Sequence, residues 1–232
     1  MKTHVLSIVI PAYNEERFIG TLLEQIADVN LDSLRVGKQV IVVDDCSQDR
    51  TSDIVRGFPW VTLKRLEKNA GKGRAVRAGM ELATGDFLII QDADLEYDPQ
   101  DYAPMMRALL DGSADIIYGS RYMGRGRHAN QSLAAYLGGR SLSLVALAFT
   151  GAYLTDTVTA LKLFPRELLT SLTLTTSGFE LDHEITAKML ARGCRIREVP
   201  VSYHPRSREE GKKIGMKDWF IGCRTFWRFR NG

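Results

Sequence analysis

The chain has 232 residues, 44% of them hydrophobic, which is enough for one α/β domain with a substantial core. A formal net charge of +3 is too small to indicate nucleic-acid binding. The cysteines, Cys46, Cys194 and Cys223, are scattered and form no Cys-X-X-Cys pair, so we expect a reducing, cytoplasmic environment without disulfides or a zinc site. No signal peptide is expected, and the longest apolar stretch, 142–154, is shorter than the roughly 20 residues that span a membrane.

The first half of the chain alternates between short apolar runs and segments with helical spacing. The apolar runs predict strands at 5–10, 39–43, 61–66, 86–90 and 114–119. Helices are predicted at 17–27, 71–83 and 101–110, and another ends at 56 with Asp49 or Thr51 as its cap. Pro11 is expected to stop the first strand. This alternation predicts parallel βαβ units in a doubly wound, mostly parallel sheet with helices on both faces.

The pattern changes after residue 120. A basic, glycine-containing loop is followed by a long, mostly apolar helix predicted at 131–149. The remaining predicted elements are a strand at 159–164, helices at 166–172 and 184–192, a strand within 195–203 that Pro200 interrupts, and a final helix at 217–229. No linker is long enough to separate two independent domains, so we expect a single domain over 1–232.

Three acidic residues at alternate positions follow the strand predicted at 86–90. They are Asp92, Asp94 and Glu96. In an extended segment alternate side chains point the same way, so the three carboxylates would converge and repel unless a cation lay among them. Mg²⁺ or Mn²⁺ suits such a site, because these ions take oxygen ligands and keep positions open for phosphate oxygens. On these residues alone, a solvated acidic loop is the other interpretation.

Polar residues also follow the first two predicted strands, at 11–15 and 44–45. Doubly wound sheets bind ligands at the carboxyl ends of their strands, so these positions are candidates for a common site. The first strand-to-helix turn contains no glycine, and the run Gly71-Lys-Gly-Arg-Ala lies elsewhere without the full dinucleotide spacing. A phosphate-binding P-loop is also absent from the sequence. A dehydrogenase and a P-loop NTPase are therefore disfavoured, and a diphosphate bound through a metal ion remains.

Several runs of polar and glycine-containing motifs are spread over nearly the whole chain. They are Ser7-Ile-Val-Ile-Pro-Ala-Tyr-Asn-Glu-Glu, Val42-Val-Asp-Asp-Cys-Ser-Gln-Asp, Asn69-Ala-Gly-Lys-Gly, Gln91-Asp-Ala-Asp-Leu-Glu-Tyr-Asp-Pro, Gly119-Ser-Arg-Tyr, Asp156-Thr-Val-Thr-Ala-Leu-Lys-Leu-Phe, Glu184-Ile-Thr-Ala-Lys and Tyr203-His-Pro-Arg-Ser-Arg-Glu-Glu-Gly-Lys-Lys-Ile. These runs resemble those of family 2 glycosyltransferases with the GT-A fold, and within that family the chain is similar to the dolichol- or polyprenyl-phosphate sugar transferases. The resemblance implies inverting, metal-dependent transfer of a hexose from GDP-mannose or UDP-glucose to polyprenyl phosphate.

The resemblance also implies roles for residues at the strand ends. The residues implied in the pocket for base and ribose are Pro11, Tyr13, Glu15, Val43 and Asp45, with Asp45 hydrogen-bonded to the base. Those of the Asp-X-Asp motif, in contact with ribose and metal, are Asp92, Ala93 and Asp94, and Glu96 is implied as a third ligand on the metal side. A metal ion in this place neutralises the leaving nucleoside diphosphate. A turn or helix-cap role is the other interpretation of Asp45.

On the acceptor side, Arg121 and Arg140 are implied near the phosphate of the lipid, since a guanidinium binds phosphate bidentately. Arg206 and Lys212 resemble residues of a basic loop that covers the donor diphosphate. Asp156 resembles the candidate catalytic base. A phosphate acceptor is already anionic near neutral pH, so Asp156 has a second interpretation, in which it only orients the acceptor or a cation.

The single domain is expected to comprise a nucleotide-sugar-binding half, 1–120, an acceptor-binding half, 121–216, and a C-terminal amphipathic helix, 217–232. That helix mixes Trp and Phe with Lys and Arg, which suits peripheral contact with the cytoplasmic face of a membrane. Packing on the domain's own core is the other interpretation of its aromatic residues. Two further functions remain open: transfer to a soluble saccharide or a protein hydroxyl, and a non-catalytic nucleotide-sugar-binding module.

Overall fold

The computed structural model describes residues 3–123, 131–205 and 216–232. Its sheet has seven strands in the order β3-β2-β1-β4-β6-β5-β7. The strands are β1 (His4–Ala12), β2 (Val36–Asp44), β3 (Val61–Arg65), β4 (Phe87–Ile90), β5 (Ile116–Ser120), β6 (Lys162–Pro165) and β7 (Ile196–Pro200). Strand β6 runs antiparallel to its neighbours β4 and β5, and the other pairs are parallel. The predicted α/β fold with a mostly parallel sheet is confirmed.

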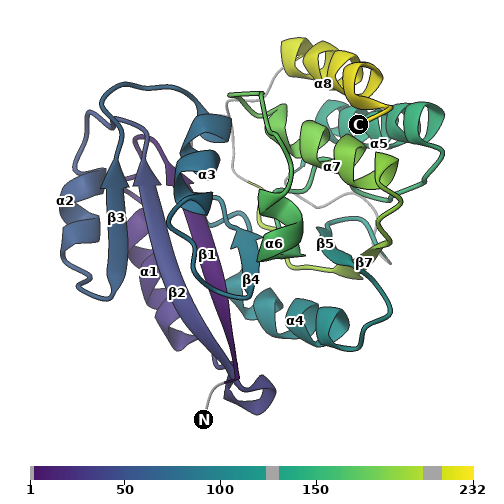
Figure 1. Cartoon of the computed structure of the whole chain (residues 1–232). Helices are drawn as coiled ribbons and strands as arrows, with labels where there is room; N and C mark the ends of the chain where they lie inside the picture. Colours follow the sequence, from purple (N-terminus) through teal and green to yellow (C-terminus); the bar gives the residue numbers. More distant parts are fainter. Residues whose placement is uncertain (1–2, 124–130, 206–215) are drawn as a thin grey trace.

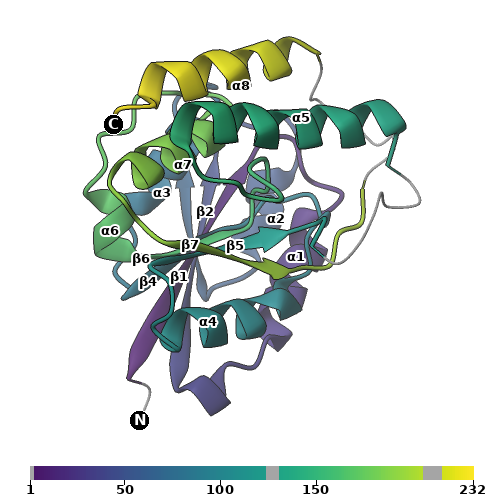
Figure 2. The same ribbon diagram turned by 90° about the vertical axis from the view of Figure 1, so that its right-hand side faces the viewer.

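Helices cover both faces of the sheet, as predicted (Figure 1). They are α1 (Ile19–Asp28), α2 (Thr51–Arg56), α3 (Lys72–Met80), α4 (Tyr102–Leu110), α5 (Leu133–Thr150), α6 (Arg166–Thr170), α7 (Leu181–Ala191) and α8 (Met216–Phe229), with short 3₁₀ turns at Asp32–Leu34 and Pro99–Asp101. Helices α1, α2 and α4 pack on one face and α3, α6 and α7 on the other. Helices α5 and α8 lie outside α7 and form a further layer (Figure 2).

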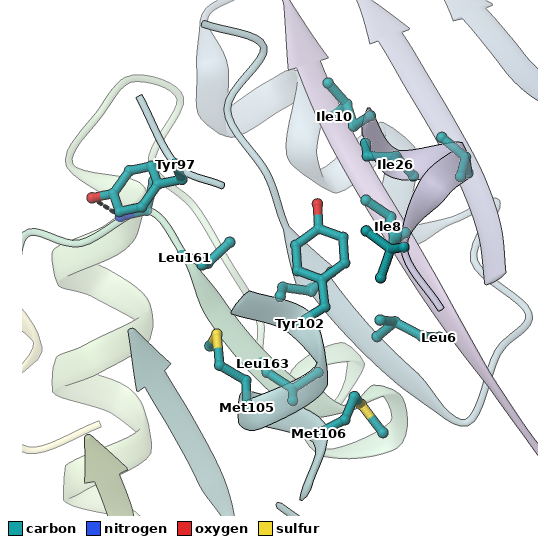
Figure 3. Close-up of a cluster of buried hydrophobic side chains, with 14 of the residues drawn as sticks. Leu6, Ile8, Ile10, Ile26, Tyr97, Tyr102, Met105, Met106, Leu161 and Leu163 are labelled. Atoms are coloured by element: carbon teal, nitrogen blue, oxygen red, sulfur yellow. Dashed lines mark hydrogen bonds between the residues drawn. The ribbon is translucent and has the colours of Figure 1, made fainter. Parts of the chain in front are cut away.

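The interior strand β1 is apolar on both faces because both are covered by helices. Leu6, Ile8 and Ile10 point to the face of α1 and α4, where Ile26 and Tyr102 complete the core (Figure 3). Val9 points to the opposite face, toward α3. Each fully buried side chain of this size contributes roughly 1.5–3 kcal/mol, so the strand is held in place mainly by apolar burial.

The first strand continues through Pro11, so the prediction that it stops there is wrong. Pro11 pairs with Val43 of β2. The carbonyl of Val9 accepts the amide of Gln91, so residues of this parity turn their backbone groups toward β4. Strand β4 ends at Ile90, so among the described residues no strand residue lies opposite the nitrogen of Pro11 on this side. The missing N–H of Pro11 therefore costs the sheet no hydrogen bond.

The Gly71-Lys-Gly run lets another backbone segment approach the first turn of α3. The amide of Gly73 donates to the carbonyl of Ser177 at 2.7 Å. A Cβ atom on Gly73 would lie 2.7 Å from the carbonyl oxygen of Thr176, and one on Gly71, whose φ is +88°, would lie 2.5 Å from that of Ser177. Arg77 also donates to the Thr176 carbonyl. These glycines therefore serve the packing of residues 175–178 on α3.

Glu184 holds the same segment from the other side. Its buried carboxylate accepts hydrogen bonds from the amides and hydroxyls of Thr175 and Thr176, and it pairs with Lys188 at 2.7 Å. Burial opposes the charge of Glu184, but the bonds from Lys188, Thr176 and Thr175 outweigh it, so its pKa lies below the usual value. The residues that enter α7 are thus fixed to both α3 and α7.

We expect Glu184→Gln to lower the free energy of unfolding by about 1–3 kcal/mol at neutral pH, because buried donors lose their acceptor. A carboxylate whose pKa is lowered by folding stabilises the folded state at any pH above its unfolded pKa, and this stabilisation is lost as the pH falls through the folded pKa. The difference in unfolding free energy between wild type and variant should therefore become smaller below about pH 4.5, the ordinary pKa of a glutamate. Denaturant unfolding at several pH values measures it, with the exposed Glu167→Gln as control; a constant difference would contradict the expectation.

Candidate active site

A cleft of about 740 Å³ opens at the carboxyl ends of β1, β2 and β4 and extends between α5 and α8. Its walls contain nine of the residues that the sequence singled out. They are Pro11, Tyr13, Glu15, Asp45, Asp92, Ala93, Asp94, Glu96 and Arg121. Residues up to 110 positions apart thus meet in one cavity, as expected from their positions at neighbouring strand ends.

The loop after β1 is fixed by hydrogen bonds to the loop after β2. Asn14 has a left-handed φ of 55°, its amide donates to Ser47 Oγ at 2.9 Å, and its side-chain oxygen accepts the amide of Gln48. The amide of Glu15 donates to Thr51 Oγ1 at 2.9 Å. These bonds hold the backbone on both sides of the cleft residues Tyr13 and Glu15.

Asp45 anchors the loop that leads into α3. Its two carboxylate oxygens accept the amides of Ala70 at 2.8 Å and Gly71 at 2.7 Å. Asp45 lines the cleft while it makes these bonds, so the turn role is observed and a bond to a nucleotide base stays a prediction. Val43, placed beside the base by the resemblance, is fully buried among residues that pack on α3 and does not line the cleft. The alternation of β2 turns it to the other side.

The expected convergence of three carboxylates is not observed, because the segment turns where an extended one was assumed. Residues 93–96 form a turn, and Leu95 has a φ of 59°. Asp92 pairs with Lys72, whereas Glu96 accepts the hydroxyl of Tyr203 at 2.9 Å. Within residues 3–123, 131–205 and 216–232, no three His, Cys, Asp or Glu side chains form a group able to hold an ion.

The donor set still fits an ion that arrives with a phosphate substrate. Mg²⁺ is commonly bound by one or two carboxylates together with substrate oxygens and water. Asp94 lines the cleft, and one of its oxygens accepts the amide of Glu96 at 3.2 Å, which fixes its direction. Asp94 is therefore the residue that would hold Mg²⁺ or Mn²⁺ beside a diphosphate.

Two charged residues of the cleft, Lys72 and Asp182, were not predicted as site residues. Lys72 Nζ lies 2.7 Å from Asp92 Oδ1 and 3.2 Å from Asp182 Oδ2. Asp182 also pairs with the fully buried Lys162 at 2.9 Å. Lys72 precedes Asp182 by 110 positions, so no local pattern in the sequence links them.

Arg121 and Asp156 form a buried, bidentate ion pair. Asp156 accepts from Arg121 Nε at 2.6 Å and from Nη2 at 2.7 Å. The Arg121 guanidinium also lies over the ring of Tyr203 at 5.0 Å. Burial opposes its charge, but Asp156 outweighs that effect and raises the pKa of Arg121. The Asp156 side chain is fully buried and does not line the cleft, which favours its interpretation as the residue that orients a cation.

Arg140 is not among the residues that line the cleft. It donates to the carbonyl of Thr155 at 2.5 Å and to the hydroxyl of Tyr153 at 2.6 Å, and its guanidinium lies 5.8 Å from the ring of Tyr122, which does line the cleft. Its contact with a lipid phosphate stays a prediction. A helix position alone did not indicate which side of α5 faces the cavity. Arg206 and Lys212 lie outside the described residues.

The outer arm of the cleft is more apolar than the part near the strand ends. Helix α5 contributes small residues at Ala134, Ala135, Gly138 and Gly139. Trp219 of α8 faces them, and its indole donates to Ser141 Oγ at 2.8 Å. The arm therefore offers apolar contact beside a polar, charged chamber.

Residues 7–162 match the sequence profile of glycosyl transferase family 2. The chain belongs to this family. It is 28% identical over 215 residues to the low-salt glycan biosynthesis hexosyltransferase Agl6 of Haloferax volcanii, covering 92% of this chain and 51% of that protein. It is 30% identical over 216 residues to the dolichol-phosphate mannosyltransferase of Pyrococcus furiosus, covering 90% of this chain and 59% of that protein. The chain thus spans little more than half the length of these relatives.

The fold is shared with glucosyl-3-phosphoglycerate synthase from Mycobacterium tuberculosis, solved with uridine diphosphate. The TM-score is 0.75 at 20% identity, and the match covers 98% of this chain and 80% of that one. Another structure of that enzyme contains Mn²⁺, uridine diphosphate and phosphoglyceric acid. At this identity the likeness establishes the GT-A-like fold alone.

We expect Asp156→Asn to destabilise the protein by about 3–5 kcal/mol, because it leaves the buried Arg121 without its charged partner. Denaturant unfolding measures this, with Asp115→Asn as control, since Asp115 forms an exposed pair with Arg195 worth about 1 kcal/mol or less. A positioning role also predicts a larger change in acceptor KM than in kcat. Unchanged stability together with a loss confined to kcat would instead identify Asp156 as a base.

Proposed function

We propose that this chain transfers a hexose, with inversion, from a nucleoside diphosphate sugar to a polyprenyl phosphate at the cytoplasmic face of a membrane. One observation carries the proposal: a single cleft joins an acidic chamber at the strand ends to an apolar arm between α5 and α8. The first suits a nucleotide sugar and its ion, and the second suits a lipid chain. Family membership supports the reaction type. GDP-mannose and UDP-glucose both remain candidate donors.

On the donor side, the base and ribose would lie against Pro11, Tyr13 and Glu15, which the strand-end loops hold in place. Asp94 would hold Mg²⁺ or Mn²⁺ with the diphosphate oxygens. When bound, the ion neutralises charge that develops on the leaving nucleoside diphosphate. Arg206 and Lys212 are retained as predicted contacts of the diphosphate.

On the acceptor side, Arg121 would bind the lipid phosphate through its charge. Asp156 takes two of the five N–H groups of the guanidinium and fixes its plane. An oxygen of the phosphate then attacks the anomeric carbon from the face opposite the diphosphate. The new C–O bond forms as the old one breaks, and the electron pair leaves with the diphosphate. The phosphate oxygen is already anionic, so this step needs no protein base.

Exposed apolar side chains on the outer layer support contact with a membrane. On α5, Leu133, Leu137 and Leu144 recur with helical spacing on the outward side, with exposures of 54–59%. On α8, Phe220 and Trp227 lie seven positions apart and are 63% and 54% exposed. Phe226 and Phe229 are instead buried against α5 and α7, so core packing accounts for part of the aromatic set.

Helix α5 is longer than the apolar stretch expected at 142–154. It has 18 residues with a mean hydropathy of 1.4 and 17% of them buried, and by length and composition it is the one helix among the described residues that could cross a membrane. Its other side packs against α7 and α8. A helix held in this way suits an orientation in the plane of the membrane surface, which is the orientation we propose.

Transfer should require a divalent ion and a lipid phosphate. With radiolabelled GDP-mannose and UDP-glucose, Mn²⁺ and polyprenyl phosphate in detergent, we expect lipid-linked product from one donor, and reversible loss of product in EDTA. Asp94→Ala should reduce transfer by at least a hundredfold without unfolding the protein, with Asp28→Ala, at an exposed position at the end of α1, as control. Product formed only with a soluble acceptor would instead identify a transferase that acts on a soluble saccharide or a protein hydroxyl. Binding without turnover of either donor would indicate a non-catalytic module.

The protein should bind anionic vesicles weakly and in a salt-dependent way. Arg224 and Arg228 are exposed on α8 beside Trp227, and each cation near an anionic surface contributes about 1 kcal/mol. Arg228→Glu should therefore reduce sedimentation with vesicles containing anionic lipid about tenfold or more in partition coefficient. Arg107→Glu, on α4 across the sheet, is the matched charge reversal and should have little effect. Equal losses in both variants, or no binding at low salt, would contradict a membrane-facing α8.

A further inference from the structure

Lys72 is a cation held between two carboxylates in the wall of the cleft. It lies in the first turn of α3, its side chain is 9% exposed, and it contacts Asp92 and Asp182. Burial opposes its charge, but Asp182 and Asp92 outweigh that effect, so the pKa of Lys72 is raised and the side chain stays an ammonium. The proposed transfer mechanism gives this residue no role.

The two oxygens of Asp92 have different surroundings. Oδ1 receives the ammonium of Lys72 at 2.7 Å, and in the described parts of the chain Lys72 is the only hydrogen-bond partner of this carboxylate. The Asp92 side chain is 24% exposed and lines the cleft. A carboxylate held at one oxygen presents the other in a fixed direction. The second oxygen is therefore placed to accept a hydrogen bond from a ligand.

Lys72 itself is fixed on several sides. The amides on either side of it, those of Gly71 and Gly73, donate to Asp45 and to the Ser177 carbonyl. Asp182, its second partner, is held in turn by the fully buried Lys162. Lys72 would therefore keep its position without Asp92, because these other contacts hold it. Asp92, in contrast, depends on Lys72 for the direction of its carboxylate.

We propose that Lys72 is a positioning residue for the donor. It holds one oxygen of Asp92 so that the other accepts a hydroxyl of the bound nucleoside, and its charge makes Asp92 a poor ligand for a divalent ion, which leaves the ion to Asp94 and the diphosphate. This inference rests on the proposed function, since it takes a nucleotide sugar as the occupant of the cleft. The ammonium acts through Asp92 and does not itself bind phosphate.

The test uses Lys72→Met and measures two affinities that should change in opposite directions. Binding of the preferred nucleoside monophosphate, UMP or GMP, without metal should weaken about tenfold, as expected for loss of a charge-assisted hydrogen bond that fixes a ligand contact. Binding of the corresponding nucleoside diphosphate in the presence of Mn²⁺ should weaken by no more than this factor. Affinity for Mn²⁺ alone, measured by electron paramagnetic resonance, should rise because the acidic chamber loses a positive charge. A fold defect would lower both affinities.

Three further variants complete the test. Lys68→Met, four positions upstream and exposed, should change neither affinity. Lys72→Gln removes the charge but keeps a polar end on a slightly shorter side chain, and it repeats the measurement if the Met variant unfolds. In an Asp92→Asn background, replacement of Lys72 should have little further effect on monophosphate binding, because the two residues act as one unit.

Unchanged monophosphate affinity in Lys72→Met, or a loss confined to the diphosphate, would overturn the inference; the second result would make Lys72 a phosphate ligand. A fall in Mn²⁺ affinity would overturn it as well. Failure of the wild-type protein to bind any of these nucleotides would contradict the proposed function instead.

Discussion

Close contact between residues 175–178 and the first turn of α3 is the constraint on which the site depends. Gly71 and Gly73 leave no side chain between the two backbones, and any Cβ atom there would meet a carbonyl group. Helix α3 belongs to the half of the chain whose strand ends line the cleft, and 175–178 leads directly into α7. The contact therefore fixes the spacing of the two walls of the cleft. Lys72 lies between the glycines, so the same contact directs its ammonium into the cavity.

Within the described part of the cleft wall, the cations Lys72 and Arg121 are held in the same way. Lys72 is held from behind by Asp182, and Arg121 by Asp156, and in both pairs the carboxylate is almost completely buried. Asp156 is supported in turn, since its amide donates to Glu198 at 2.8 Å. A buried charge is tolerated only with such partners, and the partners also fix its position. Both cations are therefore already fixed in the cleft wall, so the proposed substrates would bind with little reorganisation of these side chains.

The features that could be predicted are those that local physics decides. Apolar runs and helical spacing located the strands and helices, and the order of strand ends indicated that residues near Asp45 and Asp92 share a cavity. The expected convergence of the carboxylates failed where one backbone angle matters: the φ of Leu95 turns the acidic segment, so Glu96 accepts from Tyr203 while Asp92 pairs with Lys72. Ion pairs between distant positions, such as Lys72 and Asp182, could not be predicted either, because spacing in the sequence does not indicate which buried charges lie next to each other.

The outer layer sets the width of the apolar arm through small residues. A Cβ atom on Gly222 of α8 would lie 2.8 Å from His183 Nε2 and 3.0 Å from a methyl group of Leu142. Burial lowers the pKa of His183 to about 4, so a neutral imidazole packs there, with the ring of Phe226 at 5.1 Å. Because α8 packs this closely on α5 and α7, side chains of both α5 and α8 line the arm. The exposed Leu133, Leu137 and Leu144 lie on the side of α5 away from its cleft residues, so the apolar arm and the surface proposed to face the membrane belong to the same two helices.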